Sequence, residues 1–431
     1  MSQKATELSK TLTVGQAVGL AICIVVGSGL LVLPGLAYQQ VGGAAIYAWV
    51  IDALLVIPLL VIFAYLGANY PGAGGIAGFV QEAFSRPMGA ATEVLLLGTF
   101  SLGIPSIAVT GGNYFAMAIG GGEGVSLIAS LGLLIFAGMV NYLGAKVSGN
   151  VQQVLSYSLT GLLLFTALLA LWFGDRTIGT GVAPIQDWML SVPALGMVFF
   201  SYTGWEMLSF TTEEYKNPKR DFPIAVGISF VTIILVYLMI ALAVQYTLPH
   251  GDSRLGTAPI AALLMSVFGP LSGKFVAVVG VVIIAANLIG ATWAASRLVF
   301  ASAREGLLPG FLSRVDKKTR SPQMALLTVI LVFSAVIALH FSGAVSLGIL
   351  LQVAGQNFFI LYGLSVIAYL KLVRRPVFKA FGLFTLAVVM LTMGTFGWWL
   401  FYPLALMLFG SWMMRIRRRR NVQNQTVHLT E

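Results

Sequence analysis

The stretch Val26-Gly27-Ser28-Gly29-Leu30, followed by Pro34, interrupts the first long apolar segment of the chain. That segment is long enough to cross a bilayer, for which a helix needs about 20 apolar residues. Each glycine costs about 1 kcal/mol of helix propensity relative to alanine, and non-helical backbone at membrane depth is tolerated where it lines a cavity. The stretch therefore predicts a helix that breaks in mid-membrane, which is typical of a substrate site.

The composition places the whole chain in the membrane. It is 58% hydrophobic and 9% charged, with a mean hydropathy of +0.91, whereas soluble domains carry about 25% charged residues. The first segment lacks a leader with a small-residue cleavage site, so we expect it to be retained as a span. Cys23 is the only cysteine and cannot form an intrachain disulfide, and the three histidines lie far apart. We therefore expect no metal site and no cofactor.

The net charge of +10 indicates a membrane partner rather than nucleic acid. The basic residues gather in short loops and at the C-terminus, where Arg417–Arg420 form the densest run. This placement follows the positive-inside rule and favours contact with anionic membrane lipid. We expect no nucleic acid partner.

Hydropathy predicts an all-α membrane protein of about 12 transmembrane helices. The predicted spans are 14–40, 44–68, 88–118, 125–145, 150–173, 190–215, 223–248, 272–304, 324–341, 345–371, 379–395 and 397–415. If both termini are cytoplasmic, 22 of the 25 Lys and Arg residues lie inside, and the three outside are Arg176, Arg254 and Lys274. This bias predicts a multi-pass protein of the cytoplasmic (inner) membrane with both termini inside.

A second break is predicted in span six, where Ser201, Thr203 and Gly204 precede Glu206. A carboxylate at this depth must face protein or water. Breaks in helices 1 and 6 lie five spans apart and so cross in opposite directions, which predicts a 5+5 inverted repeat. We expect one transmembrane domain over 1–431, with repeat one at about 14–173, repeat two at about 190–371 and accessory helices at about 379–415.

The helix ends at these breaks have a chemical preference. The half-helix that begins at Ser28 presents free amides and a positive dipole end, which suit a carboxylate. The preceding half-helix ends in free carbonyls near Cys23 to Val26, which suit an ammonium group. Together they predict an α-amino acid as the small-molecule substrate. Glycine-rich packing where two helices cross is the alternative explanation of the same residues.

Several motifs resemble the amino acid–polyamine–organocation (APC) superfamily. They are the Val26–Leu30 stretch with Pro34, the first cytoplasmic loop Tyr70–Gly75, Gly204–Glu206, the exit Glu214–Pro223 and the loop Arg304–Pro309. The resemblance implies the fold of the bacterial leucine transporter, with broken helices 1 and 6 and alternating access around a substrate held between them.

The resemblance also implies roles for individual residues. Gly27, Ser28 and Gly29 would bind the carboxylate, carbonyls near Val25 and Phe200 would bind the amino group, and Phe200 would form an aromatic gate. Glu206 matches an acidic residue used for proton sensing or gating, with a structural hydrogen bond to the first break as the alternative. The full implied set of substrate-binding residues is Val25, Gly27, Ser28, Gly29, Ile104, Phe200, Tyr202, Gly204, Trp205 and Trp293.

Two departures from the pattern of the family narrow the range of expected substrates. Span five lacks the lysine that replaces a sodium ion in some members, and span three is apolar from Phe100 to Pro105. The expected pocket favours an aliphatic or thioether side chain, and the chain resembles most the bacterial methionine and branched-chain amino acid exporters. The prediction is proton-coupled secondary transport of neutral L-amino acids, with export and uptake both open. An amino acid/polyamine exchanger or uptake permease of the superfamily is the alternative.

Other charged residues carry competing interpretations. For Asp52 and Glu93 we expect an ion pair or an interfacial position rather than a proton relay. For Arg297 and Arg304 we expect a role at the inner helix end, with an inner gate to Glu213 or Glu214 as the alternative. A membrane-embedded enzyme would need convergent catalytic groups such as paired Asp, Ser/Lys or His ligands, and the sequence shows none, so we expect no enzyme.

Overall fold

The computed structural model describes residues 8, 10–175, 177–256, 259–269, 273–393 and 401–427. Helices dominate this part of the chain, and its only strand-like feature is an isolated parallel bridge between Leu12 and Tyr215. The predicted all-α class is confirmed.

The helices follow one another in a simple order. The α-helices are α1 (Val14–Val25), α2 (Ser28–Val41), α3 (Ala45–Asn69), α4 (Gly75–Ala83), α5 (Arg86–Ile119), α6 (Glu123–Tyr142), α7 (Ala145–Phe173), α8 (Val192–Phe199), α9 (Trp205–Ser209), α10 (Pro218–Thr247), α11 (Pro259–Phe268), α12 (Gly273–Arg304), α13 (Gln323–Phe341), α14 (Leu347–Leu372), α15 (Pro376–Met393) and α16 (Phe401–Val427). The short 3₁₀ helices are η2 (Gly42–Ala44), η3 (Ile185–Ser191), η4 (Phe200–Tyr202), η5 (Thr212–Glu214), η6 (Ser253–Gly256) and η8 (Gly310–Ser313).

Each predicted span contains helix. Eight helical stretches of the described chain are long and apolar enough to cross a membrane, and shorter apolar helices occupy 14–25, 185–199, 376–391 and 401–416. The short ones include the spans in which breaks were expected. One boundary differs in an instructive way: α10 begins at Pro218 rather than near Pro223, because a proline fits the first turn of a helix, where its missing N–H costs nothing.

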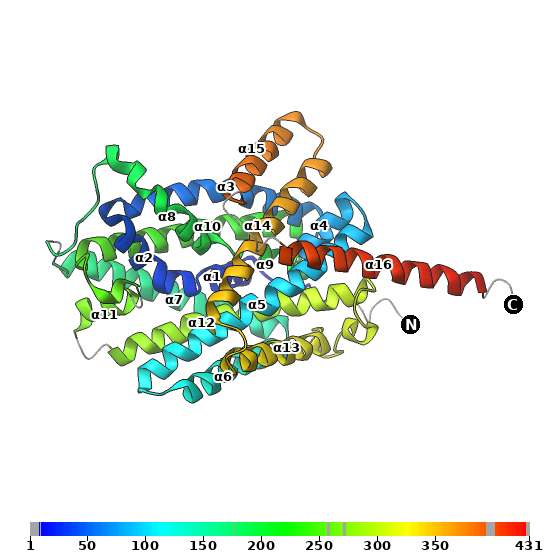
Figure 1. Ribbon diagram of the computed structural model, residues 1–431, viewed down its shortest axis with the longest axis horizontal. Helices are drawn as coiled ribbons and strands as arrows, with labels where there is room; N and C mark the ends of the chain where they lie inside the picture. The colour runs from blue at the N-terminus through cyan, green and yellow to red at the C-terminus, as the bar shows by residue number, and fades with distance from the viewer. Residues whose placement is uncertain are drawn as a thin grey trace.

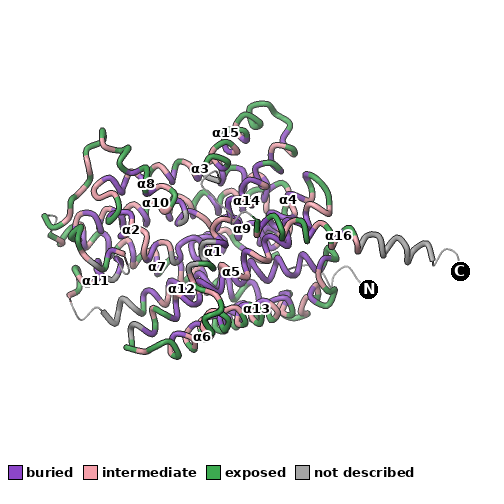
Figure 2. The backbone as a smooth tube through the Cα atoms, in the orientation of Figure 1, coloured by how far each residue is buried: buried purple, intermediate pink, exposed green. Residues whose placement is uncertain are grey.

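Most long helices run side by side, and both chain termini lie at the same end of the molecule, where α16 extends beyond the body (Figure 1). The core surrounds α1, which packs against α7, α10 and α12. Buried residues concentrate there, whereas the outer helices expose residues along much of their length (Figure 2). Many of these exposed side chains are large and apolar, such as Leu331 at 71% and Leu391 at 81% exposure. An apolar outer surface over an apolar core fits a bundle that has lipid as its solvent.

Local sequence determines where the two broken helices start. Thr13 and Gln16 form a reciprocal capping box at the start of α1, with the Gln16 amide bonded to the Thr13 hydroxyl at 3.3 Å and the Thr13 amide bonded to Gln16 Oε1 at 3.0 Å. At the second break, Gly204 adopts a φ of +115° immediately before α9. Only glycine takes this conformation without strain, so the residue type at 204 determines where this break lies.

Candidate functional site

The two breaks enclose a small cavity at the centre of the bundle. The first break separates α1 from α2 at Val26 and Gly27, and the second separates η4 from α9 at Thr203 and Gly204. The cavity has a volume of about 70 Å³. It is lined by Ile24, Val25, Gly27, Gly29, Ile107, Ser201, Thr203, Gly204, Glu206, Met207, Asn287 and Phe358.

The carbonyls at the end of α1 are capped by a side chain from α12. The Asn287 side-chain amide donates to the carbonyl oxygens of Cys23 at 3.1 Å and Ile24 at 2.6 Å. These oxygens have no partner inside α1 because the helix stops at Val25. Asn287 therefore lets a helix end in the interior without leaving buried carbonyls unbonded.

A tyrosine from α10 joins the two breaks. The Tyr237 hydroxyl lies 3.0 Å from the carbonyl oxygen of Val25 and 3.0 Å from that of Ser201. With one hydrogen it can donate to either carbonyl in turn. Its ring packs edge-on against Trp49 and Tyr202, with centroids 5.3 Å away in both cases. Tyr237 thus holds the end of α1 and the start of the second break in one arrangement.

Several polar atoms at the cavity remain unpartnered. Ser201 Oγ, Asn287 Oδ1 and Glu206 Oε1 are buried and have no hydrogen-bond partner. The other side of the lining is apolar, from Ile107 and Phe358. Buried polar groups without partners are costly in a finished core, so a mixed lining of this kind suits a ligand with a polar head and an apolar side chain.

Glu206 lies at the start of α9 and is fully buried. Its Oε2 accepts hydrogen bonds from the Gly204 amide at 3.1 Å and from the Tyr362 hydroxyl at 2.7 Å. The sequence left open a structural hydrogen bond from Glu206 to the first break, and among the described residues Glu206 makes no such bond. Instead, Glu206 caps its own half-helix, and it lines the cavity with its second oxygen unpartnered.

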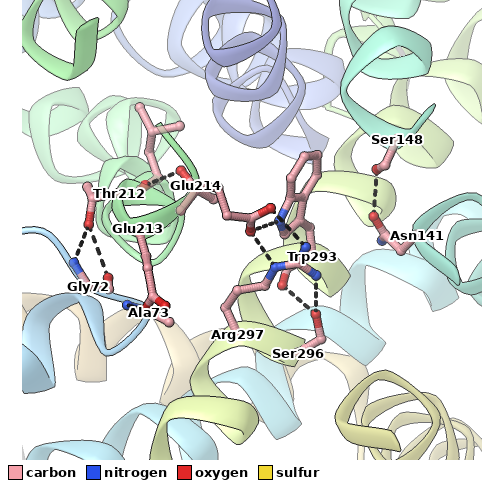
Figure 3. Close-up of polar contacts among 12 residues, drawn as sticks. Gly72, Ala73, Asn141, Ser148, Thr212, Glu213, Glu214, Trp293, Ser296 and Arg297 are labelled. Carbon is pink, nitrogen blue, oxygen red and sulfur yellow. Dashed lines mark hydrogen bonds and ion pairs between the residues drawn. The ribbon is translucent and has the colours of Figure 1, made fainter. Parts of the chain in front are cut away.

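A buried ion pair lies toward the end of the bundle that carries η5. Arg297 Nε lies 2.6 Å from Glu214 Oε1, and both side chains are 1% exposed. The Trp293 indole donates to the same oxygen at 2.8 Å, and Arg297 also donates to Ser296 Oγ at 3.0 Å (Figure 3). A buried pair is tolerated where further hydrogen bonds satisfy it, as these do for both partners.

A second ion pair, Arg304–Glu213, extends the first. We call the two ion pairs and their hydrogen-bond partners the inner network. Arg304 donates to Glu213 at 2.7 and 2.8 Å, and the Ala73 amide donates to Glu213 at 3.2 Å. Glu213 thus accepts hydrogen bonds from an arginine of α12 and from a backbone amide of the loop before α4.

Further hydrogen bonds connect the inner network to the loop before α4 and to the segment before α1. The Thr212 hydroxyl accepts from the Gly72 amide at 2.9 Å and donates to the Gly72 carbonyl at 3.0 Å (Figure 3). The Leu12 amide donates to the Glu214 carbonyl at 3.0 Å, just before α1 begins. The alternative interpretation of Arg297 and Arg304 as an inner ion-pair network is the one that the geometry supports.

Of the two other carboxylates for which we expected an ion pair or an interfacial position, Glu93 forms an ion pair within the described chain and Asp52 does not. Glu93 pairs with Arg86 at 2.6 Å and is 4% exposed. Asp52 forms none of the ion pairs found in the described residues, and its Oδ2 is buried without a hydrogen-bond partner. The expected ion pair of Asp52 was therefore wrong, and α3 instead places this side chain in the interior of the bundle with 1% exposure.

The structure brings part of the predicted binding set to the cavity. Val25, Gly27, Gly29, Gly204 and Glu206 all line it. The backbone of Ser28 starts α2 and that of Phe200 starts η4, whereas their side chains lie outside the described part of the chain. One detail of the first break differs: the Leu30 amide, expected to be free, bonds the Gly27 carbonyl at 3.2 Å.

Four other predicted residues lie outside the lining. Ile104 is buried one turn from Ile107, which lines the cavity in its place. The remaining three are aromatic and serve other contacts: Tyr202 donates to the Trp49 carbonyl at 3.0 Å, Trp205 packs against Phe230 with centroids 6.1 Å apart, and Trp293 belongs to the inner network.

We predict that Tyr237→Phe destabilises the protein by about 1–3 kcal/mol, because it leaves a buried carbonyl at one of the breaks without a donor. Thermal unfolding of the purified protein in detergent measures the effect. The matched control is Tyr157→Phe, since the exposed Tyr157 hydroxyl makes one long bond of 3.4 Å to the Gly15 carbonyl. Equal melting temperatures for the two variants would show that Tyr237 does not hold the breaks.

Comparison with known sequences places most of the chain in one family. The family model described as "Amino acid permease" matches residues 12–423. The chain is 29% identical to the uncharacterized amino acid permease YecA of Bacillus subtilis (strain 168), over 95% of this chain and 97% of that protein. It is 28% identical to the L-methionine/branched-chain amino acid exporter YjeH of Escherichia coli (strain K12), over 96% and 97%. It is 26% identical to the serine/threonine exchanger SteT of Bacillus subtilis (strain 168), over 72% of each chain.

These relatives are membrane transporters, and the family match spans nearly the whole chain with both breaks inside it. The protein therefore belongs to the amino acid permease family and is a multi-pass membrane transporter of amino acids, not an enzyme.

Proposed function

We propose that this protein carries neutral L-amino acids with aliphatic or thioether side chains across the cytoplasmic membrane by proton-coupled secondary transport, in the direction of export. The observation that carries the proposal is the cavity between the two breaks, where Glu206 is the only charged residue among the described lining residues. An anionic substrate side chain has no cationic partner there, and the one counter-charge for a cationic side chain would be Glu206, which this proposal assigns to proton coupling. A relative named as a methionine and branched-chain amino acid exporter supports the same substrate class and direction.

The proposed binding mode follows from the helix ends. The substrate carboxylate takes the start of α2, at the backbone of Gly27, Ser28 and Gly29, because a helix N-terminus offers free amides and a positive dipole end. The ammonium group takes carbonyls at the end of α1 and in η4, near Val25 and Phe200. The Val25 carbonyl already accepts from the Gly27 amide at 2.9 Å and from the Tyr237 hydroxyl at 3.0 Å. The ammonium group therefore takes the place of the Tyr237 donor at Val25, while the Tyr237 hydroxyl donates to the Ser201 carbonyl instead.

The side chain of the substrate then points to the apolar part of the lining. Ile107 on α5 and Phe358 on α14 come from helices outside the broken pair, and Met207 comes from α9. This surface accepts branched and thioether groups of variable shape, because it has no polar partner to satisfy and the flexible Met207 side chain can adapt to its neighbour. The Ile104, Tyr202, Trp205 and Trp293 side chains are not part of this proposed contact surface.

Alternating access in this proposal uses the inner network as the gate. The Arg297–Glu214 and Arg304–Glu213 pairs hold α12 to η5, and Thr212 holds η5 to the loop before α4. With these contacts made, the cytoplasmic route to the cavity is closed. We propose that their release opens the site to the cytoplasm. The proposed architecture is two inverted repeats, 14–173 and 190–371, with accessory helices at about 379–415.

Glu206 is the proposed coupling residue. It touches the cavity, a half-helix start and Tyr362 of α14 at once, so gain or loss of its proton changes contacts on both sides of the second break. Membrane carboxylates that face a cavity are typical of proton pathways. Protons and membrane lipid are accordingly the proposed partners besides the amino acid.

We predict that Gly29→Val lowers amino acid affinity about 10- to 100-fold, the loss expected when one charge-assisted hydrogen bond is blocked. A Cβ at Gly29 would lie 3.0 Å from Ser201 Oγ and 3.2 Å from Ser201 Cα, across the cavity. Binding of a panel of neutral amino acids to the purified protein measures the effect. Gly161→Val is the control, because nothing lies within 4 Å of a Cβ there. Unchanged binding by a folded Gly29→Val protein would exclude this site.

We predict that Glu206→Gln keeps substrate binding and loses the response of net flux to an imposed pH gradient. Glutamine keeps the shape and the acceptor for Tyr362 but has no proton to exchange. Flux into proteoliposomes with and without a pH gradient measures the effect, with the exposed Glu123→Gln as control. Full pH-driven flux in the variant would return Glu206 to a purely structural role.

The proposed orientation places both termini in the cytoplasm. We predict that a cysteine at Lys317 reacts with a membrane-impermeant reagent only from the cytoplasmic side, and one at His250 only from outside. The native Cys23 is buried and gives little background. Both positions are exposed, and they lie in loops that the charge bias assigns to opposite sides. Labelling of position 317 in intact cells would reverse the topology.

A further inference from the structure

A second cavity, larger than the first, lies away from the breaks. It has a volume of about 410 Å³ and is enclosed by α5, α12, α13 and the loop that contains η8. Typical residues of its lining are Phe100, Leu298, Leu312 and Phe333, and no charged residue is among them. Its volume falls within the range of small-ligand sites, about 300–1,000 Å³.

This cavity does not suit the transported amino acid. The only hydroxyls in its lining are those of Ser101 and Thr328, and the latter is bonded to the Met324 carbonyl at 2.9 Å. A zwitterion placed there would lose its hydration without replacement, which is prohibitive for both charges. The lining is suited to a hydrocarbon chain instead.

The rim of the cavity is open to the surroundings of the bundle. Phe311 in η8 is 47% exposed and Val332 on α13 is 38% exposed, and both line the cavity. Leu327 and Leu331, on the same helix, are 50% and 71% exposed. A chain can therefore enter from the lipid that surrounds α13.

The loop beside the cavity carries a cluster of cations. Leu312 lines the cavity, and the exposed Arg314, Lys317, Lys318 and Arg320 follow within eight residues. None of these four takes part in the ion pairs found in the described residues. The carboxylate of the loop, Asp316, is occupied by the amides of Lys318 and Thr319 at 2.9 and 2.8 Å. Four basic side chains beside a membrane helix are typical of a site for an anionic headgroup.

We propose that this cavity binds one acyl chain of an anionic phospholipid of the cytoplasmic leaflet, with the headgroup phosphate held by the basic loop at 314–320. The inference rests on the proposed orientation, which places this loop in the cytoplasm. The apolar cavity and the unpaired cations are adjacent in the chain and complementary to the two parts of one lipid molecule.

The position of the lipid links it to the inner network. Phe100, in the cavity wall, packs edge-on against Phe210 with centroids 5.7 Å apart, and Phe210 lies directly before the segment that carries Glu213 and Glu214. On the other side, Leu298 follows Arg297 in α12. A chain in the cavity therefore packs against the reverse side of the residues that hold the ion pairs.

The first test fills the cavity. Native mass spectrometry of the full-length protein is titrated with phosphatidylglycerol and with phosphatidylcholine of identical chains. We expect tighter binding of phosphatidylglycerol, and loss of that preference in Val332→Trp. The matched control is Val231→Trp, at an exposed valine on α10 that is 58% exposed and lines no described cavity. Equal binding of the two lipids, or equal binding by both variants, would overturn the proposal.

The second test removes the cations and leaves the cavity intact. The triple change Arg314→Gln, Lys317→Gln and Lys318→Gln is expected to weaken phosphatidylglycerol binding about tenfold or more. Its control neutralises an equal number of exposed cations, at Arg374 and Arg375 between α14 and α15 and at Lys379 in the first turn of α15. An equal loss in the control would show a diffuse surface effect and overturn the site. The assay needs no transport, so a failure here is distinct from a failure of the proposed amino acid site.

Discussion

A helix that stops inside a membrane must find partners for its exposed backbone groups, and the arrangement of this transporter depends on that constraint. Asn287 and Tyr237 provide them at the end of α1, from α12 and α10. Tyr237 also reaches the Ser201 carbonyl in η4. Because the same hydroxyl serves both breaks, the two half-helix ends are held at a fixed separation, and the cavity between them has a defined shape. The proposed substrate site is the space that this capping leaves.

The inner network differs from these caps, because it consists of charged side chains that add little net stability. The Arg297–Glu214 pair is buried, and two charges in such a place contribute little net stability compared with apolar residues of similar size. In the proposed transport cycle its value is that it would have two states, closed with all hydrogen bonds made and open with the charges hydrated. A transporter needs a contact of this kind, because apolar side chains that separate gain no favourable interactions to replace those that they lose.

The sequence predicted the features that depend on local chemistry. Glycines at 27, 29 and 204 placed both breaks, since helix propensity and positive φ are properties of a residue and its immediate neighbours. The helices within the predicted spans followed from hydropathy for the same reason. The caps did not follow, because Asn287 and Tyr237 come from more than 200 residues away and nothing local marks a polar side chain as the partner of a distant carbonyl. Trp293 was misplaced for a related reason: its aromatic character suited a pocket, but its indole N–H found the Glu214 carboxylate.

The chain connects the gate to the first break directly. Leu12 bonds the Glu214 carbonyl and pairs with Tyr215, and the capping box that starts α1 follows at Thr13. Release of the inner network would therefore free the start of α1 together with η5, while Asn287 and Tyr237 hold the other end of α1 at the cavity. A rigid half-helix held at one end and released at the other pivots rather than unfolds, because its internal hydrogen bonds stay intact. In that geometry the glycine at 27 is the natural hinge, and the break that we propose as the substrate site would also be the joint about which the proposed gate opens.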